Sequence, residues 1–181
     1  MKNFLTFLAA LLLGWNACNA QEVALSTNLL DLANFGTLNL EASYGVSQHW
    51  SLNAGLKYNP FKYANGYARN MQRAISVGTR YWPWHIFSGW WVSAAVRYQE
   101  YNQGGIFSPT TSEGDRFGGV LGGGYTYMIS PHFNLDFGLA AWTGYELFKT
   151  YSCPTCGKVT DKGGRIFLLP SDIILSVTYI F

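Results

Sequence analysis

The end of the chain carries the clearest alternation of hydrophobic and polar positions. From Ser171 to Phe181, apolar side chains occupy every second position, with polar residues such as Asp172 and Thr178 among those between them. A period of two places all of these apolar side chains on one face of an extended strand. The pattern therefore predicts a β-strand over residues 171–181 with one apolar face.

Seven upstream segments show the same alternation, each about ten residues long, the length of a strand that crosses an outer membrane. They are residues 23–30, 38–46, 50–58, 72–81, 89–101, 116–128 and 133–145. Short turns alternate with longer polar loops between them, as in membrane barrels. We therefore predict an all-β fold, an eight-stranded antiparallel up-and-down transmembrane β-barrel. Short turns 47–49, 82–88 and 129–132 would face the periplasm, and loops 59–71, 102–115 and 146–168 the cell exterior.

Aromatic residues concentrate near the expected strand ends, where amphipathic rings favour the boundary between lipid and water. At the ends joined by short turns stand Tyr44, Trp50, Tyr81, Trp82, Trp84, Trp90, Tyr127, Phe133, Tyr179 and Phe181. At the opposite ends stand Tyr58, Phe61, Tyr63, Tyr98, Tyr101, Tyr145 and Phe148. We predict two aromatic girdles, one at each face of the membrane.

The first twenty residues have the pattern of a cleavable signal peptide. Lys2 gives a basic start, an apolar stretch of about ten residues follows, and small residues precede a cut after Ala20. The apolar stretch is too short to cross a bilayer as a helix. Residues 1–20 are therefore predicted to be removed, leaving residues 21–181 as the barrel of an exported, outer-membrane protein. The alternative is a lipoprotein signal with Cys18 as the acylated residue.

The composition argues against nucleic acid as a partner and favours strands over helices. Aromatic residues make up 17% of the chain and charged residues 12%, while the net charge is +2. Many aromatics with 20 glycines favour strands and tight turns over helices. A small net charge without a run of Lys or Arg argues against nucleic acid as a partner.

Six charged residues fall on the inward parity of the predicted strands, three of each sign. An unpaired charge inside a narrow barrel costs several kcal/mol, so we expect these residues to pair into a polar plug. Arg80 and Asp136 should meet near the periplasmic end, and Glu41 should reach Lys57 or Arg97 nearer the middle. The predicted interior charge network is Glu41, Lys57, Arg80, Arg97, Asp136 and Asp172.

Cys153 and Cys156 form the most distinctive local motif, Cys-Pro-Thr-Cys-Gly. A closed structural zinc site needs four ligands. The three histidines all fall in the opposite turns, so we predict no metal within this chain. A disulfide between Cys153 and Cys156 is the simpler interpretation in an exported protein. A metal shared with a partner, or a redox-active thiol pair, are the alternatives.

No pattern of residues indicates an enzyme. No Ser, Cys or Thr nucleophile stands where a base could meet it, because every histidine falls in a turn on the periplasmic side. No phosphate-binding loop or cofactor motif occurs either. We therefore predict a protein without catalytic activity and without a cofactor.

Several segments carry resemblances to known proteins. The terminal alternation of Leu175, Val177, Tyr179 and Phe181 resembles the signal by which the barrel-assembly machinery of the bacterial outer membrane recognises its substrates. The chain as a whole resembles a family of small outer-membrane β-barrels from Bacteroidota, catalogued as a domain of unknown function. The matching segments include residues 26–30, 50–52, 58–62, 80–82, 122–125, 133–136, 153–157 and the closing strand. The chain departs from the family at residues 169–172, where a Gly-Pro-Thr-Lys type of sequence is usual.

The resemblance implies an outer-membrane location and an association with surface-fimbria genes, without an activity. We expect a membrane scaffold or a surface protein that binds partners through its long loops. Its partners would be outer-membrane lipids, the assembly machinery, and a surface or fimbrial protein. Candidate contact residues in the first long loop are Tyr63, Asn65, Tyr67 and Arg69. The alternatives are a narrow solute or ion pore and a lipid-modifying outer-membrane enzyme.

Overall fold

The computed structural model describes residues 23–63, 68–105, 110–153 and 157–181, and this part of the chain is almost entirely β-structure. The shorter elements come first: β1 (Val23–Asn28), α2 (Leu29–Ala33), β2 (Leu38–Gly45), β3 (Trp50–Asn59) and β4 (Lys62–Tyr63). The longer strands follow: β5 (Ala68–Tyr81), β6 (Gly89–Gly104), β7 (Thr111–Met128), β8 (Phe133–Tyr151) and β9 (Val159–Ile180). No helix among these residues is long and apolar enough to cross a membrane.

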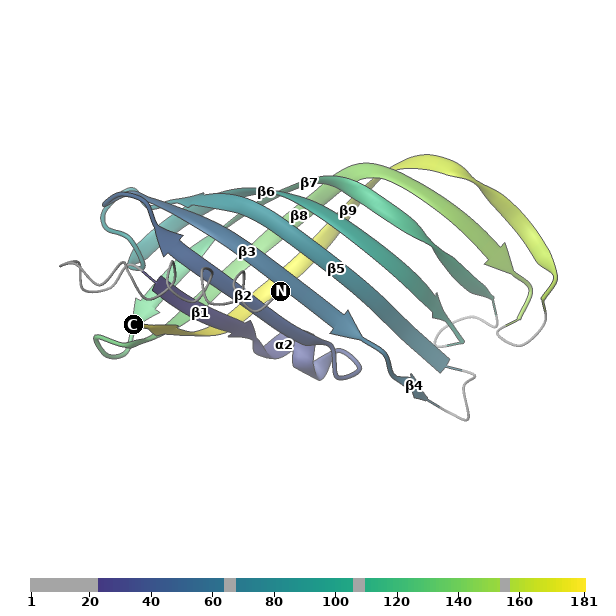
Figure 1. The fold of residues 1–181 in the computed structure, drawn as a ribbon, viewed down its shortest axis with the longest axis horizontal. Helices are drawn as coiled ribbons and strands as arrows, with labels where there is room; N and C mark the ends of the chain where they lie inside the picture. Colours follow the sequence, from purple (N-terminus) through teal and green to yellow (C-terminus); the bar gives the residue numbers. More distant parts are fainter. Residues whose placement is uncertain (1–22, 64–67, 106–109, 154–156) are drawn as a thin grey trace, which may run out of the picture.

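Eight antiparallel strands run up and down in a closed ring (Figure 1). Neighbours in sequence are neighbours in the ring, and β3 pairs directly with β5 because β4 is a two-residue extension. The closing strand pairs back onto the first, with Ala24 opposite Ile180 and Asn28 opposite Ser176. The predicted strand number, the up-and-down order and the pairing of the first strand with the last are confirmed.

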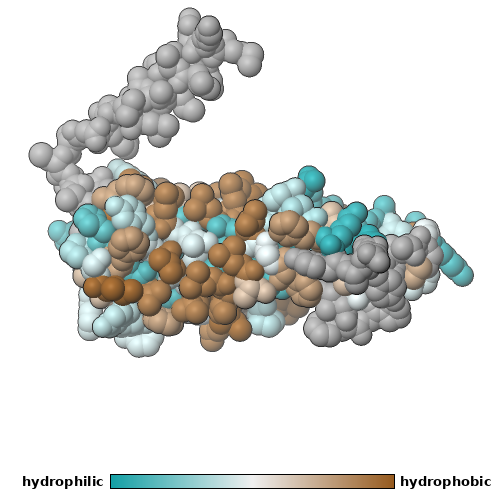
Figure 2. Space-filling model, turned by 90° about the horizontal axis from the view of Figure 1, so that it is seen from below, coloured by the Kyte–Doolittle hydropathy of each residue, from teal (hydrophilic) through white to brown (hydrophobic). Residues whose placement is uncertain are grey.

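The ring has its apolar side chains on the outside and its polar side chains on the inside. Along β3 the outward residues Leu52 and Leu56 are exposed, whereas the inward residues Ser51 and Asn59 are buried. Figure 2 shows the outward apolar residues as a brown band between two more polar ends. The alternation in the sequence therefore separates an apolar outer surface from a polar interior.

One end of the ring is closed by aromatic side chains. Trp82, Phe87 and Trp91 are buried there, and the rings of Trp82 and Phe87 meet edge to face with centroids 5.8 Å apart. The segment that carries them is tied inward, since the Asn134 side chain donates to the Phe87 carbonyl at 2.7 Å. The prediction of an outward girdle position for Trp82 is therefore wrong. We call residues 82–88 with Trp91 the closed end.

The other end rises unevenly, because strand lengths differ around the ring. β3 has 10 residues, one more than the predicted 50–58, but β7, β8 and β9 have 18, 19 and 22. In Figure 1 these strands run far past α2 and the end of β2. We call residues 99–104, 111–118, 143–151 and 159–171 the collar.

The collar corrects the predicted loops. Most of the predicted loops 102–115 and 146–168 lies in paired strands. These segments are rich in polar residues and glycine and lack a regular apolar alternation, so the strand signal fades. The first strand is also shorter than predicted, because Asn28 caps α2 by accepting from the Leu30 N–H at 3.1 Å.

Candidate functional site

The first polar cluster of the interior is built around Arg80, directly above the closed end. Its guanidinium donates to Glu41 at 2.9 Å, lies 3.8 Å from Asp136, and stacks over the Trp91 ring at 4.3 Å. Asp136 also accepts hydrogen bonds from the Thr126 and Thr178 hydroxyls. Arg80 and Asp136 therefore meet near the predicted end of the ring, but Glu41 pairs with Arg80 and not with the predicted Lys57 or Arg97.

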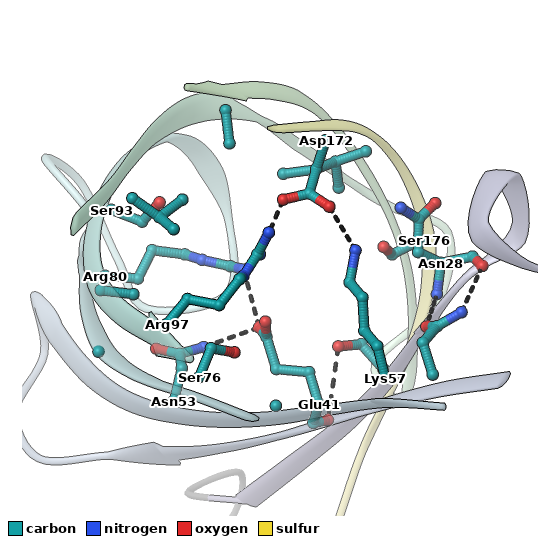
Figure 3. Close-up of a pocket in the computed structure, with 18 of the residues that line it drawn as sticks. Asn28, Glu41, Asn53, Lys57, Ser76, Arg80, Ser93, Arg97, Asp172 and Ser176 are labelled. Carbon is teal, nitrogen blue, oxygen red and sulfur yellow. Dashed lines mark hydrogen bonds and ion pairs between the residues drawn. The ribbon is translucent and has the colours of Figure 1, made fainter. Parts of the chain in front are cut away.

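The second cluster, in the middle of the interior, is built around Asp172 (Figure 3). Lys57 binds one of its carboxylate oxygens, and Arg97 binds the other at 2.8 Å. Lys57 also forms an ion pair with Asp31 at 2.7 Å. Asp31 lies between the first two predicted strands, and α2 brings it here. All six predicted inward charges thus lie inside the ring, each with a partner of opposite charge.

The third cluster lies in the collar and was missed by sequence reasoning. Glu146 is 1% exposed, and its carboxylate accepts hydrogen bonds from Arg116 at 2.8 Å and from Arg165 at 2.8 Å. It also accepts from the Tyr101 hydroxyl, while Arg116 stacks over the Tyr101 ring at 3.9 Å. Register places Arg116 and Arg165 directly opposite Glu146, a signal visible once β7–β9 are known to extend that far.

This surrounding environment changes how two groups of the collar titrate. Burial raises the pKa of the Glu146 carboxyl, but hydrogen bonds from Tyr101 and Arg165 and the charge of Arg116 outweigh burial and hold it below its usual value. Burial and the bond to Glu146 raise the pKa of the Tyr101 hydroxyl well above its usual value. Glu146 therefore carries its charge, and Tyr101 its proton, at neutral pH.

Several cavities follow the axis of the ring, including one of about 180 Å³ between the Asp172 cluster and the collar. A cavity of about 110 Å³ separates the Arg80 and Asp172 clusters, and Figure 3 shows charged and hydroxyl side chains surrounding it. A wider cavity of about 500 Å³ opens inside the collar, with Tyr101, Glu146 and Arg165 among its lining residues. The interior is therefore a polar well that narrows from the collar toward the closed end.

The remaining predicted residues are placed as follows. Leu175, Val177 and Tyr179 share the outer side of β9, and the Tyr179 ring packs against Phe181, the residue after the strand, with centroids 4.9 Å apart. Cys153 is disulfide-bonded, but Cys156 lies outside the described residues, so their pairing stays a prediction.

The structure describes only part of the candidate contact loop. Arg69 lies in β5 opposite Lys62, and Tyr63 contributes backbone to β4. Asn65 and Tyr67 lie outside the described residues, as does the predicted signal peptide. Within the described ranges, no group of three or more His, Cys, Asp or Glu residues could hold a metal ion.

The sequence also relates this chain to one known family. No curated protein matches the chain. The family described as "Protein of unknown function (DUF3575)" matches residues 5–181, a range that begins within the predicted signal peptide and includes all of β9. The predicted resemblance to a family catalogued as a domain of unknown function is thus confirmed. The ring, its paired interior charges and its collar therefore belong to a member of the DUF3575 family.

Proposed function

We propose that this protein is an eight-stranded outer-membrane β-barrel, without catalytic activity, that presents its collar at the cell surface to bind a partner. The observation that carries the proposal is the inverted distribution of polarity. Apolar patches on water-soluble monomers rarely exceed a few hundred Å². Here exposed Leu, Ile and Val side chains follow every long strand, including Leu40, Leu56, Ile75, Val77, Val96, Leu121, Leu139 and Ile173.

The dimensions of the shorter strands support the same proposal. About ten residues of tilted strand span the roughly 25 Å apolar layer of an outer membrane. β3 has this length, and the exposed rings of Trp50 and Tyr58 stand at its two ends. Amphipathic rings are stable at the two lipid–water boundaries. The collar then rises beyond the lipid on the side away from the closed end.

A scaffold that binds partners fits the interior better than a pore does. Among the described residues, paired charges and the closed end leave no open passage, and an eight-stranded barrel is only wide enough for its side chains. The carboxylates of Asp136, Asp172 and Glu146 are each held by a cation, an arrangement that stabilises structure and leaves none of the three poised as a base. A narrow pore would need the closed end to move.

The proposal also assigns the two ends of the chain and the partners. Residues 1–20 would act as the signal peptide, so that residues 21–181 form the mature barrel. The outer side of β9 near Phe181 would bind the assembly machinery, and the outward apolar band would contact outer-membrane lipids. A surface or fimbrial protein is the partner class that we propose for the collar.

Fractionation and gel mobility test this proposal. We expect the mature protein in the outer-membrane fraction, beginning at Gln21, with an electrophoretic mobility that changes on boiling because a folded barrel resists detergent. A protease added to intact cells should cut in the collar and leave the apolar band intact. Recovery in the soluble fraction, or a mobility unaffected by boiling, would refute the proposal.

A further inference from the structure

One strand edge of the ring has no partner over most of its length. β9 pairs with β8 from Val159 to Tyr179, but with β1 only from Ser176 to Ile180. Just above that point, the Asn28 side chain takes the place of a strand by donating to the Ile173 carbonyl at 3.1 Å. Within the described ranges, no strand pairs with this side of residues 159–172, which we call the β9 edge.

The β9 edge is open to solvent as well as unpaired. Every residue from Val159 to Ile166 is exposed, so this part of the strand is largely accessible to solvent. Figure 1 shows why: β1 and α2 stop well short of the collar, whereas β9 continues past them to its far end. Its backbone N–H and C=O groups form a template for another strand.

We infer that the β9 edge binds an extended segment of a partner protein, which adds to the collar as a further β-strand. Backbone groups in a row select an extended peptide over other ligands, because such a peptide satisfies them at regular spacing. Gly163 and Gly164 lie within this edge and add no side chain of their own, while the rings of Tyr145 and Phe148 from β8 lie over their two faces. The inference deepens the proposed function, since it names how the surface collar would engage its partner.

The outward side chains of β9 define the chemistry of that partner. Leu168 and Ile166 are 74% and 83% exposed above the proposed membrane level, so apolar residues should face them. Lys162 is the next charged side chain on the same face, and its cross-strand neighbour on β8 is Lys149. The partner segment should therefore carry two alternate apolar residues and, four positions further along, an acidic residue opposite Lys162.

The neighbouring charges sharpen this assignment. Lys149 on β8 lies directly opposite Glu113 on β7 on one side and opposite Lys162 on β9 on the other. Glu113 is therefore a neighbour of Lys149, and one strand separates it from Lys162. Glu113 also accepts hydrogen bonds from Tyr151 and Asn102. Lys162 forms no ion pair with any residue in the described ranges, and its positive charge is available to an acidic partner. Pro170 has no N–H and limits the pairing at the lower end.

The experiment uses the full mature chain, refolded in lipid nanodiscs, and a displayed library of random peptides about ten residues long, the length of a typical strand. Selected peptides should share the alternating apolar–acidic pattern. Each is then resynthesised with one backbone amide methylated at a time, which removes one hydrogen-bond donor. We expect binding to be lost at every second position and retained at the positions between, because only one edge of the peptide strand pairs.

Variants of the protein complete the test. Lys162→Glu should weaken binding about tenfold by placing like charges opposite each other, and Ile166→Ser should weaken it to a similar extent. Lys62→Glu, an equal change of charge on β4, is the control and should leave binding unchanged. Absence of selected peptides, or binding that tolerates methylation at every position, would overturn the inference. If the protein is heat-modifiable and membrane-bound but fails this test, the inference is wrong and the proposed outer-membrane barrel stands. If the protein is soluble but passes this test, the proposed outer-membrane barrel is wrong.

Discussion

Removing the charge of Glu146 gives the sharpest test of the collar as a built structure. Glu146→Gln keeps the size of the side chain but leaves Arg116, which is mostly buried, without its anion. Breaking a buried ion pair costs about 3–5 kcal/mol. Arg165 is 62% exposed and can return to water, and Arg116 keeps its stacking on Tyr101, so we expect a smaller loss in the free energy of unfolding, about 2–3 kcal/mol.

Urea unfolding of the refolded protein, followed by tryptophan fluorescence, measures this loss. With a slope of about 1–3 kcal/mol per molar urea, the midpoint should fall by roughly 0.7–3 M. Arg165→Gln is the matched control, because it removes the exposed partner and should cost less than about 1 kcal/mol. Limited proteolysis should also cut the β8–β9 hairpin faster in Glu146→Gln than in the control.

The same residue predicts how stability depends on pH. The pKa of Glu146 in the folded protein lies below its usual value of 4.5, so the ionised carboxylate favours folding above about pH 4.5. This contribution should be lost as the pH falls through the lower pKa of the folded state. Glu146→Gln should flatten the decline. If Glu146→Gln is no less stable than Arg165→Gln, or keeps the full pH dependence, the cluster does not hold the collar together.

The other predictions concern the interior, the closed end and the cysteines. Arg80→Met should abolish heat-resistant folding, since it leaves Glu41 and Asp136 without their cation; unchanged gel mobility before boiling would show that Arg80 is dispensable. Planar bilayers should register no steady conductance from the native protein, whereas Phe87→Gly should produce current through the weakened closed end; a conducting native protein would contradict the paired interior. Intact mass after alkylation without reduction should show no free thiol on Cys153 or Cys156, and two labelled thiols would exclude the disulfide.

The strands that the proposed membrane covers were readable in the sequence. Apolar and polar environments lie on opposite faces of β2, β3, the lower part of β5 and the lower part of β6. Each face selects its own kind of side chain, so the alternation reveals that a segment is a strand, how long the strand is and which residues face inward. The inward parity of Lys57 and Asp172 followed directly from it. The family resemblance rested on segments from the same strands.

The partners of the charges were not readable in this way. Neighbouring strands are staggered, so residues at equal distances from their strand ends do not lie opposite each other. Arg80 pairs in register with Ser51 and Ser93, yet its long side chain reaches Glu41 on β2 and Asp136 on β8. Counting positions from the strand ends therefore assigned Glu41 to the wrong cation. The stagger is a property of the closed ring and not of any one strand.

The sequence by itself thus determined the eight strands, their order and which residues face inward, because each strand of the apolar band separates two different environments. The tertiary structure decided the rest. Above the band the regular apolar alternation is lost, so nothing in residues 146–151 or 159–170 distinguishes a strand from a loop until backbone pairing is seen. The cluster around Glu146 and the unpaired β9 edge exist only through that pairing, since each is a relation between strands and not a pattern along one of them.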